Sequence, residues 1–274
     1  MAMEPLELYR DENHVCLMFT DLVEEDAQAV QANQFLIVDH GTGAIIDPGG
    51  NLAFNALYMG MVRYFPPHKL SYLIASHADP DIIASLDRWL TSTRAPLVIS
   101  RVWERFVPHF TKAGKTENRV IPVADCGGIL PLGGSELHIL PAHFLHAEGN
   151  FHFYDPISRI LFTGDLGVSL TDGYIAREPI TQLAPHLPRM EGFHRRYMVS
   201  NKVLRLWVAM ARQLDISLIV PQHSAPIMGA AIAQLFDWLD HLMCGVDLMD
   251  NRAYQLPSQP IATTATLSQP LAHA

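Results

Sequence analysis

Cysteine is scarce in this chain, with three residues among 274. Cys16, Cys126 and Cys244 are isolated and form no Cys-x-x-Cys pair, so neither a disulfide framework nor a thiolate zinc site is predicted. Basic residues are also few, because 19 lysines and arginines stand against 28 acids and give a net charge of −9. Binding to phosphates needs clusters of lysine and arginine, so this composition argues against a nucleic-acid partner.

Long apolar runs are lacking as well. No stretch approaches the roughly 18 apolar residues of a membrane helix, and residues 1–7 have neither the basic nor the apolar region of a secretory signal. We therefore expect a cytoplasmic protein with no membrane partner. The chain is 49% hydrophobic and 17% charged, which suits one large, well-packed domain. We assign that domain to residues 1–250 and a flexible tail, rich in Pro, Thr and Ala, to residues 251–274.

Short β-rich runs alternate with helical spacing in the first half of the chain and cluster in the second half. Strands are expected within 13–20, 34–39, 44–47, 70–75, 96–100, 127–140, 151–156, 160–163 and 216–220. Helices are expected at 51–65, 81–91, 102–110 and 201–214. This order predicts an α/β (α+β) chain in which two sheets are flanked by helices.

Histidines and aspartates follow four of these strands, where a metal site at a sheet edge needs its ligands. The candidates are His77, Asp79 and Asp81 after 70–75, His146 after 137–140, Asp165 after 160–163, and His223 after 216–220. Two carboxylates beside one histidine suit a harder metal such as iron or manganese, whereas zinc more often takes His and Cys. A metal centre at the edge of the sheets is therefore predicted.

This arrangement resembles the metallo-β-lactamase superfamily, in which metal ligands lie on loops at strand ends along one edge of an αββα sandwich. The resemblance covers roughly residues 30–230. The spacings between consecutive candidates also fit, with 69 residues from His77 to His146, 19 from His146 to Asp165 and 58 from Asp165 to His223. Asp79 is similar to the acidic residue of the flavodiiron branch, where the hydrolases carry histidine. The segment looks closest to the stand-alone oxygen-binding diiron members of that branch.

The resemblance implies two iron ions bridged by Asp165. One would also be held by His77, Asp79 and His146, and the other by Asp81 and His223. There are two departures from the family pattern. Asp79 replaces the usual Glu, and Ile82 occupies the position of another histidine ligand. The second iron is therefore one nitrogen ligand short.

Several of these residues also have plainer structural interpretations. Asp81 could be the N-cap of the following helix, and Asp165 could serve the turn it forms with Gly164. His138 and His143 compete with His146, which is preferred because it matches the family spacing. His223 could be an ordinary loop histidine. His152 is interpreted as a structural residue or as a residue that supports the ligands, and not as a ligand itself.

The resemblance also places Tyr197 near the centre, where its hydroxyl would donate a hydrogen bond to bound oxygen. A partly buried core tyrosine is the alternative.

The predicted ligand is O₂ or NO. Relatives sustain reduction with FMN in a fused flavodoxin domain, and the roughly 25 residues after the core are too few for one, so no FMN is expected in this chain. We therefore expect a sensor or single-turnover module with a signalling protein or an external electron donor as partner, and a homodimer is left open. The alternatives are the catalytic half of a split O₂/NO reductase, a zinc-dependent hydrolase of the same fold, and an interaction module with a degenerate site.

Overall fold

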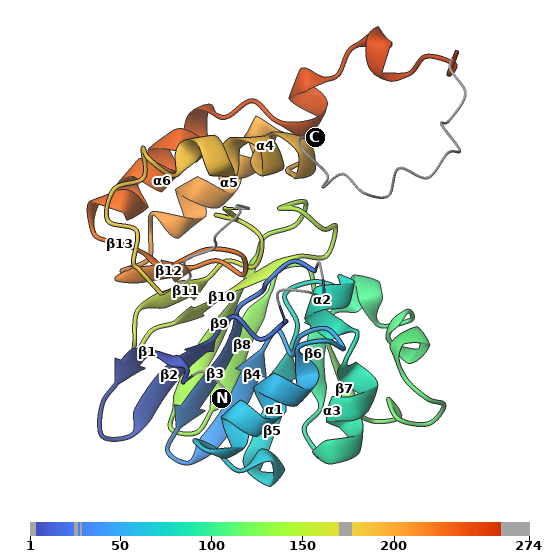
Figure 1. The fold of residues 1–274 in the computed structure, drawn as a ribbon, viewed down its shortest axis with the longest axis vertical. Helices are drawn as coiled ribbons and strands as arrows, with labels where there is room; N and C mark the ends of the chain where they lie inside the picture. The colour runs from blue at the N-terminus through green and yellow to red at the C-terminus, as the bar shows by residue number, and fades with distance from the viewer. Residues whose placement is uncertain (1–3, 25–26, 28, 170–176, 259–274) are drawn as a thin grey trace.

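The computed structural model describes residues 4–24, 27, 29–169 and 177–258, and its strands form two sheets that pack face to face (Figure 1). Among these residues one sheet has seven strands in the order β1-β2-β3-β4-β5-β6-β7, and the other has six in the order β13-β12-β11-β10-β9-β8. Helices cover the outer face of each sheet, α1 to α3 on the first and α4 to α6 on the second. The predicted αββα sandwich is therefore confirmed.

The first sheet comes from the first half of the chain. Its strands are β1 (Leu6–Arg10), β2 (His14–Phe19), β3 (Gln34–Asp39), β4 (Thr42–Ile46), β5 (Leu70–Ile74), β6 (Leu97–Ser100) and β7 (Val120–Val123), covered by α1 (Phe54–Val62), α2 (Pro80–Ile83) and α3 (Leu86–Ser92). Pairing is antiparallel from β1 to β4 and parallel from β4 to β7. Ile45 packs under the helices while Ala44 and Ile46 face the other sheet, because neighbouring strand residues point to opposite faces.

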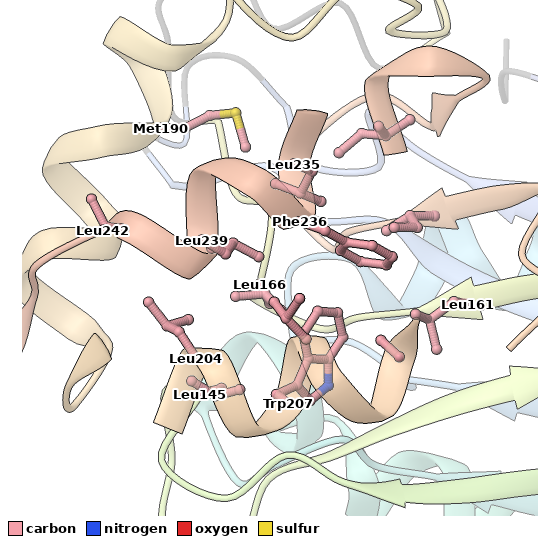
Figure 2. Close-up of a cluster of buried hydrophobic side chains, with 14 of the residues drawn as sticks. Leu145, Leu161, Leu166, Met190, Leu204, Trp207, Leu235, Phe236, Leu239 and Leu242 are labelled. Carbon is pink, nitrogen blue, oxygen red and sulfur yellow. The ribbon is translucent and has the colours of Figure 1, made fainter. Parts of the chain in front are cut away.

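The second sheet is built from β8 (Gly128–Leu132), β9 (Ser135–Pro141), β10 (Phe151–Asp155), β11 (Ile160–Phe162), β12 (Leu218–Val220) and β13 (Ile227–Met228), and it is covered by α4 (Leu187–Tyr197), α5 (Asn201–Ala211) and α6 (Ala230–His241). Figure 2 shows the core beneath these helices, where Trp207 of α5 and Phe236 of α6 pack towards Leu161 of β11. The centroids of the Trp207 and Phe236 rings are 5.8 Å apart. This apolar layer holds the helices against the sheet.

Some expected elements differ from those observed. The helix expected at 81–91 is two helices, α2 and α3, because the Ser85 hydroxyl donates to the Gly49 carbonyl over 2.6 Å at the junction. The helix expected at 102–110 is a pair of 3₁₀ turns, η3 (Arg101–Trp103) and η4 (Val107–Phe110). A further 3₁₀ turn, η2 (Pro67–Lys69), precedes β5. Strands β1, β7 and β13 and helices α4 and α6 were not anticipated.

The end of the described chain bears on the predicted tail. Two 3₁₀ turns, η5 (Gly245–Leu248) and η6 (Asn251–Ala253), follow α6, and Tyr254 and Leu256 are exposed. The rest of the predicted tail, from residue 259, lies outside the described residues, so the division at residue 250 stays a prediction. Within the described chain, no helix has the length and apolar character needed to span a membrane.

Candidate metal centre

Six side chains from both halves of the chain converge at one edge of the sandwich. They are His77 after β5, Asp79 and Asp81 at the start of α2, His146 between β9 and β10, Asp165 after β11 and His223 after β12. Backbone hydrogen bonds tie their loops together, since the Phe151 N–H donates to the Ser76 carbonyl over 2.9 Å and the Gln222 N–H donates to the Gly164 carbonyl over 2.7 Å. The strand register of both sheets thus sets the position of these loops.

One group of donors surrounds a single oxygen of Asp165. Its Oδ2 lies 2.9 Å from His146 Nε2 and 4.0 Å from His77 Nε2. Asp79 Oδ2 lies 3.4 Å from His146 Nε2 and 3.6 Å from His77 Nε2. Ligand bonds of about 2.0–2.3 Å keep the donors of one ion within about 4.6 Å of one another. The four distances given above, from 2.9 to 4.0 Å, lie within this limit. Each of the four residues offers a donor atom within 4.8 Å of the others, so the group could hold a metal ion.

A second group surrounds the other oxygen of Asp165. His223 Nε2 lies 3.4 Å from Asp165 Oδ1 and 3.3 Å from Asp81 Oδ2. Asp165 therefore presents one carboxylate oxygen to each group. A carboxylate shared in this way suits two ions about 3.5–4 Å apart.

Two buried polar atoms at this centre have no hydrogen-bond partner among the described residues, namely His77 Nε2 and Asp165 Oδ1. Leaving such atoms unpaired in a protein interior costs about 1–3 kcal/mol each. Cations between the two groups of donors would satisfy both atoms. The residues present therefore fit a pair of metal ions.

Neighbouring groups hold the imidazole rings in place. His223 Nδ1 donates to the Gln31 carbonyl over 2.6 Å, which leaves Nε2 as the nitrogen that faces Asp165 and Asp81, and His77 Nδ1 is 2.9 Å from the Ser76 hydroxyl. Such partners of the second ring nitrogen are typical of metal-binding histidines. The Ser76 N–H donates in turn to Asp47 over 2.8 Å, and burial raises the pKa of the Asp47 carboxyl to about 6.

His194 also supports the centre, and sequence analysis missed it. From α4 its Nδ1 donates to the Met190 carbonyl over 2.7 Å, and its Nε2 accepts the Gly167 N–H over 2.9 Å. Burial lowers the pKa of His194 to about 4, so the ring is neutral and its Nε2 accepts this bond at neutral pH. The helix is thereby fixed to the turn that carries Asp165. The only sequence signal was a Met and a His spaced four residues apart.

Protons occupy the centre when no metal is bound. Burial disfavours the charged form of His146 and His223, but the adjacent Asp165 outweighs it, with help from Asp79 and Asp81, and raises both histidine pKa values to about 10. The same histidines hold the pKa of Asp165 well below its usual range in spite of burial. A metal ion must displace these protons, because histidine coordinates through a neutral nitrogen.

We therefore expect opposite pH trends for stability and for metal binding. Because the folded pKa values of His146 and His223 lie above 6.5, their contribution to the free energy of unfolding of the metal-free protein is complete below about pH 6.5 and is lost as the pH rises through about 10. Over the same interval iron affinity should rise with pH. Urea unfolding and calorimetric iron titration of the chelator-treated protein would measure both, with His146→Ala expected to flatten each trend. Metal-free stability that rises with pH would contradict this assignment.

Comparison with known proteins places the chain in a family. A family model described as "ODP family beta lactamase" matches residues 30–224. The chain belongs to the ODP family. A solved chemotaxis sensor ODP, captured as its peroxy diiron species, is 36% identical, with 90% of this chain and 98% of that chain covered and a TM-score of 0.79. The apo state of the chemotaxis sensor ODP from T. denticola is also 36% identical, with 89% and 97% covered and a TM-score of 0.80.

More distant relatives are larger proteins. A flavo di-iron protein mutant from Thermotoga maritima is 17% identical, with 86% of this chain and 60% of that chain covered and a TM-score of 0.71, which supports the fold alone. An uncharacterized protein from Methanocaldococcus jannaschii is 24% identical over 196 residues, which is 70% of this chain and 48% of the relative. A diflavin flavoprotein from Synechocystis is 28% identical over 140 residues, 50% of this chain and 22% of the relative. The chain thus spans about half the length of the first curated relative and less of the second.

The residues that competed with His146 lie elsewhere in this ODP-family chain. His138 is bonded to Glu136 at 2.9 Å, and His143 Nε2 is 2.7 Å from the Asp125 carbonyl. Neither has an ion pair with the predicted ligands, whereas His146 lies beside Asp165. His152 is fully buried and packs edge-on against Trp207, and burial lowers its pKa to about 3.

The position of Asp81 in α2 differs from the one that the N-cap interpretation requires. Asp79 is the N-cap residue of α2, and Asp81 lies in its first turn, so the interpretation of Asp81 as an N-cap is wrong. The side chains of Asp79 and Asp81 are 43% and 39% exposed, so this side of the centre is open to solvent. Ile82 is fully buried among the apolar side chains under α1 and α3.

Tyr197 lies at the rim of the centre and is not a core residue, since it is 54% exposed. Its ring stacks on Phe193 with centroids 4.5 Å apart and meets the His146 ring edge-on at 5.6 Å. The alternative of a partly buried core tyrosine is therefore wrong. The end of α4 places a half-exposed phenol directly beside a candidate ligand.

Proposed function

We propose that this ODP-family protein binds two iron ions at the centre around Asp165 and uses them to sense a diatomic gas, O₂ or NO. The observation that carries the proposal is the position of Asp165, with one carboxylate oxygen in each of two groups of His and Asp donors. The 36% identity to a chemotaxis sensor with a diiron centre, over 98% of its length, supports the same conclusion.

The donor types favour iron over zinc. The six proposed ligands are His77, Asp79, Asp81, His146, Asp165 and His223, three carboxylates and three imidazoles with no thiolate. Mixed nitrogen and oxygen sites of this kind suit iron(II), and zinc hydrolases rely more on histidine. When bound, the two irons supply an open coordination position and the electrons that reduce a diatomic ligand.

The chain's own residues supply access and hydrogen bonding. Asp79 and Asp81 are partly exposed, so a small ligand reaches the centre from their side, while His77 and Asp165 are buried beneath them. Tyr197 lies beside His146 at the rim, and we assign its hydroxyl as a hydrogen-bond donor to an incoming diatomic ligand. Leu145 and Leu166, the sequence neighbours of His146 and Asp165, are fully buried in the apolar cluster under α4 to α6 and anchor the two loops there.

A sensor should react with one gas molecule and then remain oxidised until a donor reduces it. We expect the chemically reduced protein to consume about one O₂ per iron pair, with reduction back much slower than oxidation. An oxygen electrode and stopped-flow absorption would measure this, and the zinc-loaded protein is the matched control because zinc carries no redox electrons. Rapid, continuous O₂ or NO consumption with an added flavodoxin or rubredoxin would instead identify the catalytic part of a reductase.

A further inference from the structure

A second group of metal-ligand side chains lies at the opposite edge of the sandwich. His14 begins β2, Cys16 follows two residues later, and Asp155 ends β10. β10 is antiparallel to β11, so its end lies away from the edge at which Asp165 follows β11. This second group therefore joins the first sheet to the second, remote from the centre described above.

The donor atoms of this group face one another. His14 Nε2 lies 2.8 Å from Asp155 Oδ2, Cys16 Sγ lies 3.5 Å from His14 Nε2, and Cys16 Sγ lies 3.4 Å from Asp155 Oδ2. Each residue is only 1% exposed. Zinc bonds of about 2.0–2.3 Å at tetrahedral angles separate nitrogen, oxygen and sulfur donors by about 3.3–3.6 Å. Both sulfur distances already match, and the nitrogen and oxygen need to separate by about 0.5 Å.

The surrounding groups orient these donors. Asp39 Oδ1 lies 2.9 Å from His14 Nδ1, so the opposite nitrogen of the ring points at Cys16 and Asp155. A carboxylate on the outer nitrogen of a histidine is a common support for a zinc ligand. Asp39 is held by the Gly134 N–H over 2.6 Å, and the Ser158 hydroxyl donates to Asp155.

Charge balance also permits a metal ion here. Without metal, both nitrogens of His14 face carboxylates and carry protons, so the imidazolium and two carboxylates leave one net negative charge. A zinc ion would displace the Nε2 proton of His14 and the thiol proton of Cys16. The resulting neutral imidazole, thiolate, two carboxylates and divalent ion again carry one net negative charge. The buried site therefore exchanges two protons for one zinc ion without added charge.

We propose that His14, Cys16 and Asp155 form a mononuclear zinc site that fastens the two sheets together. The sequence predicted no thiolate zinc site because the three cysteines are isolated along the chain. The fold brings Cys16 to a histidine on its own strand and to an aspartate 139 residues away. This site is independent of the proposed iron pair, which contains no cysteine.

Cobalt(II) tests the proposal, because a thiolate ligand gives a charge-transfer absorption in the near ultraviolet that oxygen and nitrogen ligands do not. The metal-free full chain carrying Asp165→Asn, titrated with Co²⁺, should develop this absorption at about one equivalent per chain. Adding Cys16→Ser should abolish it, and adding Cys126→Ser or Cys244→Ser, the matched controls, should leave it unchanged. Absence of the absorption with Cys16 intact, or its persistence in Cys16→Ser, would overturn the zinc site and leave a buried ion-paired histidine.

A measurement on the unaltered chain covers the case in which Cys16→Ser fails to fold. The unaltered chain, loaded first with two equivalents of iron and then with one equivalent of zinc, should show about one sulfur neighbour per zinc at about 2.3 Å in its zinc X-ray absorption spectrum. A spectrum with nitrogen and oxygen neighbours alone would overturn the proposal. Loss of iron in Asp165→Asn with retention of this zinc would separate the two centres, so either proposal can fail without the other.

Discussion

Replacement of Asp165 by asparagine should remove both metal ions at once. One carboxylate oxygen of Asp165 faces His146 and the other faces His223. Among the described residues, no other proposed ligand belongs to both groups. Loss of a shared ligand should weaken iron binding by more than the roughly 100-fold that follows loss of a supporting residue. Iron per chain, measured after anaerobic purification and gel filtration, should fall from about two to near zero.

Asp215→Asn is the matched control for this change. Asp215 is an exposed aspartate paired with Arg159, and its replacement should leave the iron content unaltered. If Asp165→Asn instead loses half of its iron, Asp165 binds one ion only, and the shared carboxylate proposed above would be rejected.

The two metals should also differ in how firmly they are held. Around Asp165 Oδ2 the proposed donors include His77, Asp79 and His146, whereas Asp165 Oδ1 has only Asp81 and His223 beside it. With one donor fewer and a partly exposed carboxylate, the second ion should leave first. Iron removal by a chelator should therefore be biphasic, with the rate of the fast phase about tenfold or more above that of the slow phase. His223→Ala should increase the share of iron lost in the fast phase.

Ile82→His tests the reason for this difference, since it adds a nitrogen next to Asp81. It should slow the fast phase of iron loss. Ile83→His is the matched control, because Ile83 is equally buried in the same apolar cluster and its replacement carries the same burial cost. Equal release of both ions by the natural chain, or identical behaviour of the two histidine variants, would contradict the proposed ligand division.

The sequence predicted those parts of the fold whose signal is local. The strand at Gln34–Asp39 matches the prediction at both ends because its apolar run is bounded by turn residues. Helix α4 was missed because within it only Met190 and His194 are buried, which gives a weak helical period. Helix α6 has a helical spacing of buried apolar residues at Leu235, Phe236 and Leu239, so its position is predictable from the sequence although it was not predicted.

The candidate centre was predicted as a list of residues, and its geometry was not. Ligand-type residues after strands are visible in the sequence, but the separation of Asp165 from His146 and His223 depends on pairing between β11 and β12, which are more than 50 residues apart. The contact between Cys16 and Asp155 likewise arises from packing of one sheet on the other. Such long-range contacts have no local signature, so the second cluster was not foreseen.

The metal content of the chain purified anaerobically from iron-replete cells, compared between the natural protein and Asp165→Asn, tests the central claim most directly. We expect the two proteins to differ by about two irons per chain, and air oxidation to change the absorption spectrum of the natural protein alone. A difference made up of zinc, accompanied by thioesterase or lactonase turnover, would rule out the iron pair and indicate a hydrolase.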